Sequence, residues 1–166
     1  MNKLLVFGGW LALLLAGCTT ARKQEYTGVG SDSGYISGTT LPPRQEGVSF
    51  LGDRVVKNQF APVYFGFDRS DIPPSEMPKL QQVASFMKRG GINVILAGFT
   101  DERGTEEYNR ALGERRAQAV RDALIGLGAS PARIQTVSFG LEMPADPGHN
   151  EAAWAKNRRV ETGLVR

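Results

Sequence analysis

Strand-like and helix-like segments alternate between residues 63 and 165, and this alternation constrains the fold more than any other feature of the chain. β-prone segments are expected at 63–67, 92–100, 134–139 and 158–165. Helical segments are expected between them, at about 75–89, 106–127 and 151–156. Crossover helices between strands favour parallel pairing, with the helices packed on the sheet. The sequence therefore predicts an α/β domain of order β-α-β-α-β-(α)-β, with helices on a mixed four-stranded sheet.

The N-terminus has the pattern of an export signal. A lysine at position 3 precedes an apolar run at 4–15 that is shorter than the roughly 20 residues needed to cross a bilayer. The run ends in Leu15-Ala16-Gly17-Cys18, which resembles the bacterial lipobox, where the signal is removed before a cysteine that then carries lipid. We therefore predict a signal peptide at 1–17 and lipidation of Cys18; the alternative is an ordinary signal with an incidental cysteine. Thr19 after the cysteine, where an inner-membrane retention signal would have aspartate, favours an outer-membrane anchor.

Composition divides the remaining chain into a linker and one domain. Residues 18–49 are rich in Gly, Ser and Thr and lack a sustained apolar period, which predicts a flexible, disordered tether. The domain is expected at 50–166, although 48–60 could either begin it or pack on it.

The net charge of +3, without a clustered basic run, argues against nucleic acid as a partner. One histidine and one cysteine leave no zinc site and no Ser-His-Asp set, so we expect neither a cofactor, beyond the lipid on Cys18, nor an enzyme.

The long helix at 106–127 carries an arginine in an unexpected place. Arg116 lies four residues from both Leu112 and Val120, in line with the apolar stripe of the helix. A guanidinium on such a face needs a partner, because burial of an unpaired charge is very unfavourable. The candidate partner is Asp101, in the turn after the second strand, and Asn109 lies on nearly the same line of the helix. The loop at 68–71 follows the first strand in the same sense and could meet this turn at one edge of the sheet.

An aspartate and an arginine at one cleft can hold a zwitterion. The carboxylate takes an ammonium group, and the planar guanidinium takes a carboxylate through two parallel hydrogen bonds. The alternative is a structural salt bridge between Asp101 and Arg116 with no ligand, and spacing alone leaves both readings open.

A longer pattern resembles a known family. Residues 98–109 read GFTDERGTEEYN and residues 112–117 read LGERRA, which resembles the signature of the OmpA-like peptidoglycan-binding domain, above all in its lipid-anchored members. The stretches at 63–68, 138–144, 148–153 and 157–159 agree with it, so the resemblance covers about 60–166.

The resemblance implies a binding protein of the cell wall. Its members bind the diaminopimelate residue of uncrosslinked peptidoglycan stem peptides. The resemblance assigns the ammonium end of that residue to Asp101, its carboxylate to Arg116 and support of the same pocket to Asn109. It places Phe67 and Asp68 in the loop that lines the pocket, and we add Asp71 from the same loop.

The lipid-anchored members also tether the outer membrane to the wall and join the Tol system in envelope integrity and cell division. That implies TolB, and TolA, as partners.

One residue departs from the family pattern, and two other functions stay open. The family usually has histidine where this chain has Phe99, which replaces an imidazole near the site by an apolar ring.

A cell-wall hydrolase or amidase is the first alternative function, although no acid–base pair or metal set is evident. A wall-binding subunit of another envelope machine, such as a secretion or motility complex, is the second.

Overall fold

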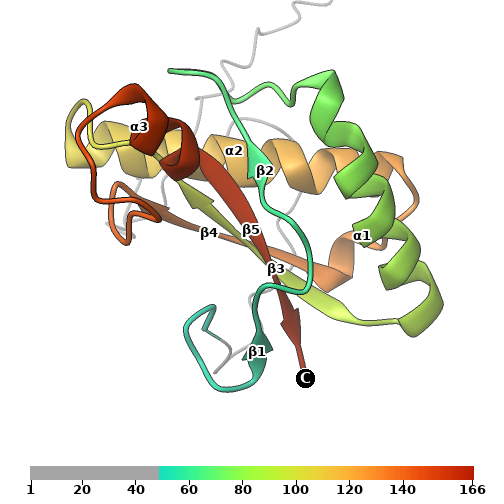
Figure 1. Ribbon diagram of the computed structural model, residues 1–166. Helices are drawn as coiled ribbons and strands as arrows, with labels where there is room; N and C mark the ends of the chain where they lie inside the picture. The colour runs from blue at the N-terminus through green and yellow to red at the C-terminus, as the bar shows by residue number, and fades with distance from the viewer. Residues whose placement is uncertain (1–48) are drawn as a thin grey trace, which may run out of the picture. The chain divides into compact units, whose positions relative to one another are not determined.

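The computed structural model describes residues 49–166 (Figure 1). The predicted signal peptide, the lipidation of Cys18 and nearly all of the linker lie outside these residues. The helices are α1 (Met77–Gly90), α2 (Glu106–Gly126) and α3 (Glu151–Asn157), with short 3-10 turns at Pro74–Glu76 and Pro131–Arg133. The strands are β1 (Val55–Val56), β2 (Val63–Tyr64), β3 (Asn93–Phe99), β4 (Ile134–Gly140) and β5 (Arg159–Val165).

These strands form one mixed sheet, which confirms the predicted α/β class. Its order is β1-β5-β3-β4. The short strand β2 pairs with the same edge of β5 as β1, but at the other end of that strand. Only β3 and β4 run parallel; β5 is antiparallel to β1, β2 and β3. The sheet has one strand more than predicted because Val55–Val56 pairs with the end of β5, and two residues are too few to show a period. The first predicted strand is shorter than 63–67, since only Val63–Tyr64 pairs.

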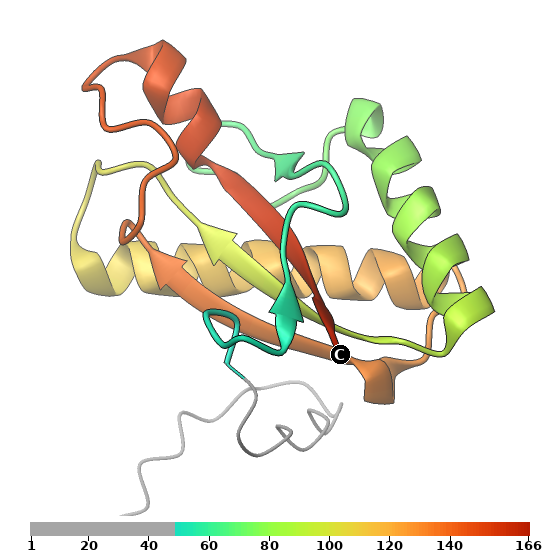
Figure 2. The ribbon, with the colours of Figure 1, turned by 60° about the horizontal axis from the view of Figure 1, so that its bottom comes forward.

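Helices α1 and α2 cover one face of the sheet (Figures 1 and 2). The helix expected at about 75–89 buries one apolar face, which consists of Leu80, Val83, Ala84 and Met87. They pack with Val94, Leu96, Val120, Leu124 and Ile134, which are fully buried. We call this set the helix-side core.

The opposite side of β3 faces a smaller aromatic cluster. Side chains alternate along a strand, so Ile95, Ala97 and Phe99 point away from the helix-side core. The ring of Phe99 stacks on Phe139, with centroids 5.3 Å apart, and Phe50 packs against both. Within the described part of 48–60, Phe50 packs on the sheet and Val55–Val56 forms one of its strands, so this segment belongs to the domain.

Helix α2 crosses β3 backbone to backbone. A Cβ atom on Gly98 would overlap the carbonyl oxygen of Gly113, and one on Gly113 would overlap the side-chain oxygen of Ser138 on β4, so neither glycine can carry a side chain without a local shift. Arg116 lies one turn after Gly113, and this close approach brings it to the carboxyl end of β3.

Candidate functional site

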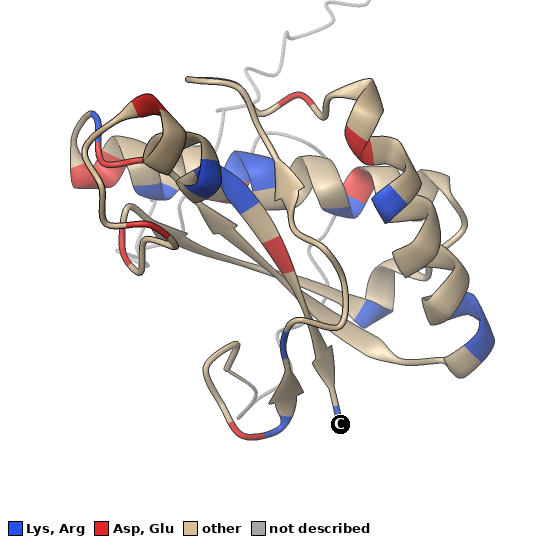
Figure 3. Ribbon diagram, viewed as in Figure 1, with Lys and Arg blue, Asp and Glu red and all other residues tan. Residues whose placement is uncertain are grey.

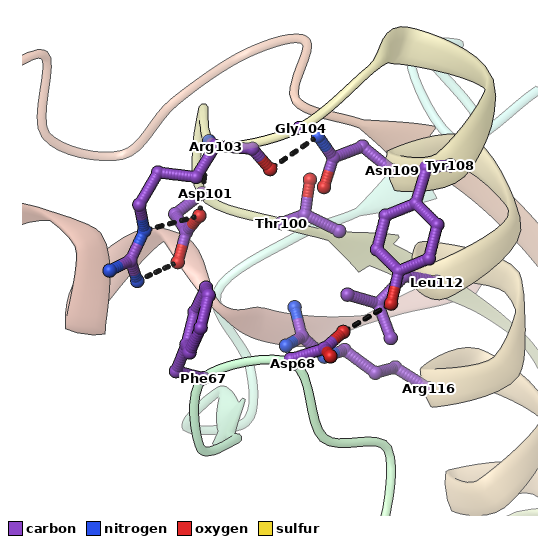
Figure 4. A pocket seen from close by; sticks show the side chains of 10 residues that line it. All are labelled: Phe67, Asp68, Thr100, Asp101, Arg103, Gly104, Tyr108, Asn109, Leu112 and Arg116. Atoms are coloured by element: carbon purple, nitrogen blue, oxygen red, sulfur yellow. Dashed lines mark hydrogen bonds and ion pairs between the residues drawn. The ribbon is translucent and has the colours of Figure 1, made fainter.

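A pocket of about 200 Å³ opens at the carboxyl end of β3, between that strand, the start of α2 and the loop after β2 (Figure 4). Charged residues of both signs gather at this end of the sheet, near α3 (Figure 3). The lining residues come from three segments: Phe67, Asp68, Thr100, Asp101, Arg103, Gly104, Tyr108, Asn109, Leu112 and Arg116.

Arg116 is completely buried and is held by backbone carbonyls. Its Nε donates to the oxygen of Arg69 at 2.8 Å, one terminal nitrogen to Phe99 at 2.9 Å and the other to Gly66 at 3.1 Å. Burial lowers the pKa of Arg116 to about 10, opposed by the negative charge of Asp101. Each terminal nitrogen keeps a second N–H, so the guanidinium can still offer two donors to a carboxylate.

Asp101 and Arg116 line the same pocket but form no salt bridge with each other. The carboxylate of Asp101 instead accepts from Arg103, at 3.1 Å to Nε and 2.6 Å to a terminal nitrogen, and from Arg158 at 3.3 Å. Burial opposes ionisation of this carboxyl, yet the hydrogen bonds from Arg103 and Arg158 prevail and lower its pKa. The alternative reading, a structural salt bridge between Asp101 and Arg116, is therefore wrong: the partners of Arg116 are carbonyl oxygens, which no sequence pattern predicts.

Arg103 organises the turn that carries Asp101. Its guanidinium lies between two rings, 3.9 Å from the centroid of Phe67 and 4.1 Å from that of Trp154. Its carbonyl oxygen accepts from the side chain of Asn109 at 3.0 Å, and Asn109 is itself 1% exposed. These contacts join the loop after β2, the turn after β3 and helices α2 and α3 around one carboxylate.

The mouth of the pocket is partly aromatic. Phe67 and Tyr108 are 57% and 44% exposed, whereas the buried rings of Phe50, Phe65 and Phe99 are at most 4% exposed. The hydroxyl of Tyr108 donates to Asp68 across the mouth, and this hydrogen bond raises the pKa of Tyr108 (Figure 4). Asp68 has a positive φ of 54°, a left-handed conformation that aspartate tolerates better than most residues.

Two residues singled out from the sequence, Asp71 and Phe99, and the single histidine lie elsewhere. Asp71 does not line the pocket; it is exposed and pairs with Arg69 at 2.7 Å. The ring of Phe99 lies on the other side of the sheet, 3.9 Å from the guanidinium of Arg159, so only its carbonyl serves the site. His149 is exposed and contacts Glu102 at 2.7 Å.

Sequence reasoning gave no binding role to five of the lining residues. Tyr108 and Leu112 precede Arg116 by two turns and one turn of α2, so helical spacing could have placed them on the same line. Thr100, Arg103 and Gly104 flank Asp101 in the predicted turn, but no spacing rule distinguishes the residues of a turn that face a cavity.

Two findings describe what residues 49–166 lack. Among them, no His, Cys, Asp and Glu side chains gather in a group of three or more that could hold a metal ion. Within the same residues, no helix has the length and apolar character required to cross a membrane.

Comparison with known proteins identifies the family. Residues 64–158 match the OmpA family. The chain is 41% identical over 165 residues to the peptidoglycan-associated lipoprotein of Pseudomonas aeruginosa, covering 96% of this chain and 98% of the relative. The crystal structure of the peptidoglycan-associated lipoprotein from Burkholderia pseudomallei superposes with a TM-score of 0.58 at 46% identity, covering 63% of this chain and 87% of that one.

A more distant structure shares the fold alone. The C-terminal domain of Helicobacter pylori MotB has a TM-score of 0.57 at 23% identity and covers 64% of this chain and 84% of that one.

The family match and the curated relatives show that the chain belongs to the OmpA family. Within it, the chain belongs to the peptidoglycan-associated lipoproteins, a non-catalytic family of the cell envelope.

Proposed function

We propose that residues 50–166 bind the stem peptides of peptidoglycan in the pocket at the end of β3, through the diaminopimelate residue. The observation that carries this proposal is the presence of a buried carboxylate, Asp101, and a buried guanidinium, Arg116, on the wall of one pocket. The free end of diaminopimelate has an ammonium and a carboxylate on the same carbon, and a site with both charges can hold both groups at once.

Each charge has a defined task in this proposal. The two remaining terminal N–H groups of Arg116 can donate to the two oxygens of the ligand carboxylate, while three carbonyls fix the orientation of the guanidinium. Asp101 takes the ligand ammonium and shares its oxygens with Arg103, whose position between Phe67 and Trp154 keeps it close. Asn109 supports the turn through the Arg103 carbonyl, and Phe67 and Asp68 border the mouth.

The second half of the proposal concerns anchoring. Lipid on Cys18 would hold the chain at the outer membrane, with residues 18–49 as the linker and the domain facing the periplasm. The lipobox and the names of the relatives, which are lipoproteins, support it. By the family resemblance, the protein would act in the Tol system, with TolB and TolA as partners, in envelope integrity and cell division.

Binding is tested with purified sacculi and, by calorimetry, with a diaminopimelate-containing stem peptide. Asp101→Asn and Arg116→Lys remove a charge or the planar fork, and we expect each to weaken binding by roughly tenfold or more. The matched controls are Asp71→Asn and Arg115→Lys, whose side chains lie outside the pocket. Equal affinity of folded Asp101→Asn protein and wild type would overturn the site.

Anchoring is tested separately in cells. Wild-type protein should incorporate an alkyne palmitate analogue and fractionate with the outer membrane, whereas Cys18→Ser should do neither. Undiminished label on Cys18→Ser protein would contradict the lipid anchor and leave the binding proposal untouched.

A further inference from the structure

The end of the domain remote from the pocket carries an excess of positive charge. The last residues of β5 pair with β1 and with the start of β3, and the start of β3 pairs with the start of β4, so these segments meet at one end of the sheet. Helix α1 ends there too, just before β3. The cations of these segments, which we call the basic end, are Arg54, Lys57, Lys88, Arg89 and Arg133.

Three of these cations have no carboxylate partner, unlike most others in the described domain. Within residues 49–166, no ion pair joins Lys88, Arg89 or Arg133 to an acidic side chain, and all three are exposed. Lys88 donates instead to the carbonyl of Leu127 at 3.1 Å. In the same part of the chain, the cations that do pair with Asp or Glu are Arg69, Lys79, Arg103, Arg110, Arg121, Lys156, Arg158 and Arg159.

The charge of the domain is therefore polarised along β3. Asp53 is the only acidic residue in the segments 49–57, 88–93 and 126–134, which contain all five cations of the basic end. The remainder of residues 49–166 has 13 acidic side chains against 11 Lys and Arg. Figure 3 shows the contrast: blue at the end of α1, before β4 and around β1, and both colours near α3. The basic end thus fits an anionic surface.

An exposed leucine lies beside these cations. Leu51 is 48% exposed and belongs to the turn that leads into β1, three residues before Arg54. Lys57, just after β1, lies over the ring of Phe50 at 5.3 Å from its centroid. Surfaces that bind at a membrane interface combine an apolar group, which enters the headgroup boundary, with cations that meet the phosphates. A soluble polyanion would make no use of the leucine, so this composition favours a membrane.

The chain also enters the described domain at this end. Residue 49 lies in the turn before β1, and 30 residues, 19–48, separate it from Cys18. A chain of that length reaches at most about 100 Å, so a lipid on Cys18 keeps the domain within that distance of a membrane. The pocket lies at the other end of β3, whose seven residues span roughly 20 Å.

From the proposed function the next step takes only the lipid anchor. We infer that the basic end docks on the anionic phospholipid surface of the membrane that holds Cys18. Phosphate groups lie against Lys88, Arg89 and Arg133, and Leu51 enters the headgroup layer. A domain docked in this way turns its pocket away from the membrane and towards the wall. The membrane then orients the binding site in addition to limiting its distance.

The test uses residues 18–166 with Cys18→Ser, so that the surface is measured without the lipid. The probes are vesicles of phosphatidylcholine alone and vesicles of equal parts phosphatidylcholine and phosphatidylglycerol, in a sedimentation assay. We expect binding to the anionic vesicles only, and weaker binding as the salt concentration rises. The double variant Arg89→Gln/Arg133→Gln should bind them roughly 25-fold more weakly, at about fivefold for each charge removed. Leu51→Ser should bind about tenfold more weakly.

The matched control removes two charges elsewhere. Arg110→Gln/Lys156→Gln lowers the net charge equally, through exposed cations of α2 and α3 that pair with Glu142 and Asp146. It should bind anionic vesicles within about twofold of the parent protein, since its cations are already paired. Binding of sacculi by Arg89→Gln/Arg133→Gln should be unchanged, because both residues are remote from the pocket.

Three outcomes would overturn the inference. Equal binding to both kinds of vesicle would remove the role of anionic lipid, and an equal loss in variant and control would show that only net charge matters. Leu51→Ser binding like the parent protein would leave an ionic contact open to any polyanion and would overturn the assignment to a membrane. Failure of the proposed function is read separately, as absent palmitate label on wild-type protein or absent binding of the stem peptide.

Discussion

The pocket residues Asp101, Asn109 and Arg116, which we call the pocket wall, are as deeply buried as the helix-side core but have the opposite chemistry. Leu96, Val120 and Leu124 of the core have no exposed surface, and neither does Arg116 of the pocket wall. Asn109 and Asp101, also in the wall, are 1% and 4% exposed. Burial alone therefore says little about what a residue does in this domain.

The difference lies in how each region tolerates change. Apolar packing stabilises roughly in proportion to buried area, so any core position contributes in the same way. In the pocket wall, each charged side chain depends on a few specific hydrogen-bond partners. Removal of one side chain leaves its partners without a hydrogen bond. Substitutions in the core should change stability alone, whereas those in the wall should change both stability and recognition.

The largest expected effect lies in the core. Leu96→Ala should lower the free energy of unfolding by about 2–5 kcal/mol, because it removes a fully buried side chain between β3 and the helices. Urea denaturation measures the loss. The folded fraction should bind the stem peptide as wild type does; a parallel loss of affinity would break the distinction between the two regions.

A somewhat smaller loss of stability is expected from Arg116→Met, together with a loss of binding. This change keeps an unbranched side chain but leaves the carbonyls of Gly66, Phe99 and Arg69 without their donor, and should lower the free energy of unfolding by about 2 kcal/mol. Denaturation and peptide titration measure the two losses. Arg115→Met, on the exposed side of α2, is the control and should change neither.

The third effect is one of pH. Because the pKa of Asp101 is lowered from its ordinary value of 3.8 by the folded state, its contribution to stability is present above that value and is lost as the pH falls through the folded-state pKa. Wild type should therefore lose more Tm than Asp101→Asn between about pH 5 and about pH 3. Parallel curves for the two proteins would show that Asp101 is no better stabilised in the folded state than in the unfolded chain.

The smallest effect is expected outside both regions. Asp71→Ala removes an ion pair with Arg69 in which both side chains are more than 60% exposed, at 66% and 62%. Exposed pairs of this kind contribute little, so Tm should not change measurably and affinity for the stem peptide should stay within about twofold. A clear loss of affinity would return Asp71 to the binding surface.

The sequence predicted those helices and strands in which apolar residues recur at regular intervals. Helices α1 and α2, strand β3 and the buried position of Arg116 follow from apolar spacing. The two-residue strand β1 and the carbonyl partners of Arg116 could not be predicted, since a carbonyl of Gly66 or Arg69 is chemically the same as any other. The position of Arg103 between Phe67 and Trp154 could not be predicted either, because these three residues lie in segments that are distant in sequence.

The contact between Gly98 and Gly113 sets a rule for anyone who would redesign this pocket. Strand and helix meet there without side chains, so nothing between them can be trimmed, and any addition pushes α2 and Arg116 outward together. The distance from the guanidinium to the strand is thus a fixed dimension of the scaffold. Libraries that aim at other amino-acid ligands should leave this pair constant and vary the exposed rings at the mouth, Phe67 in the loop after β2 and Tyr108 in the first turn of α2.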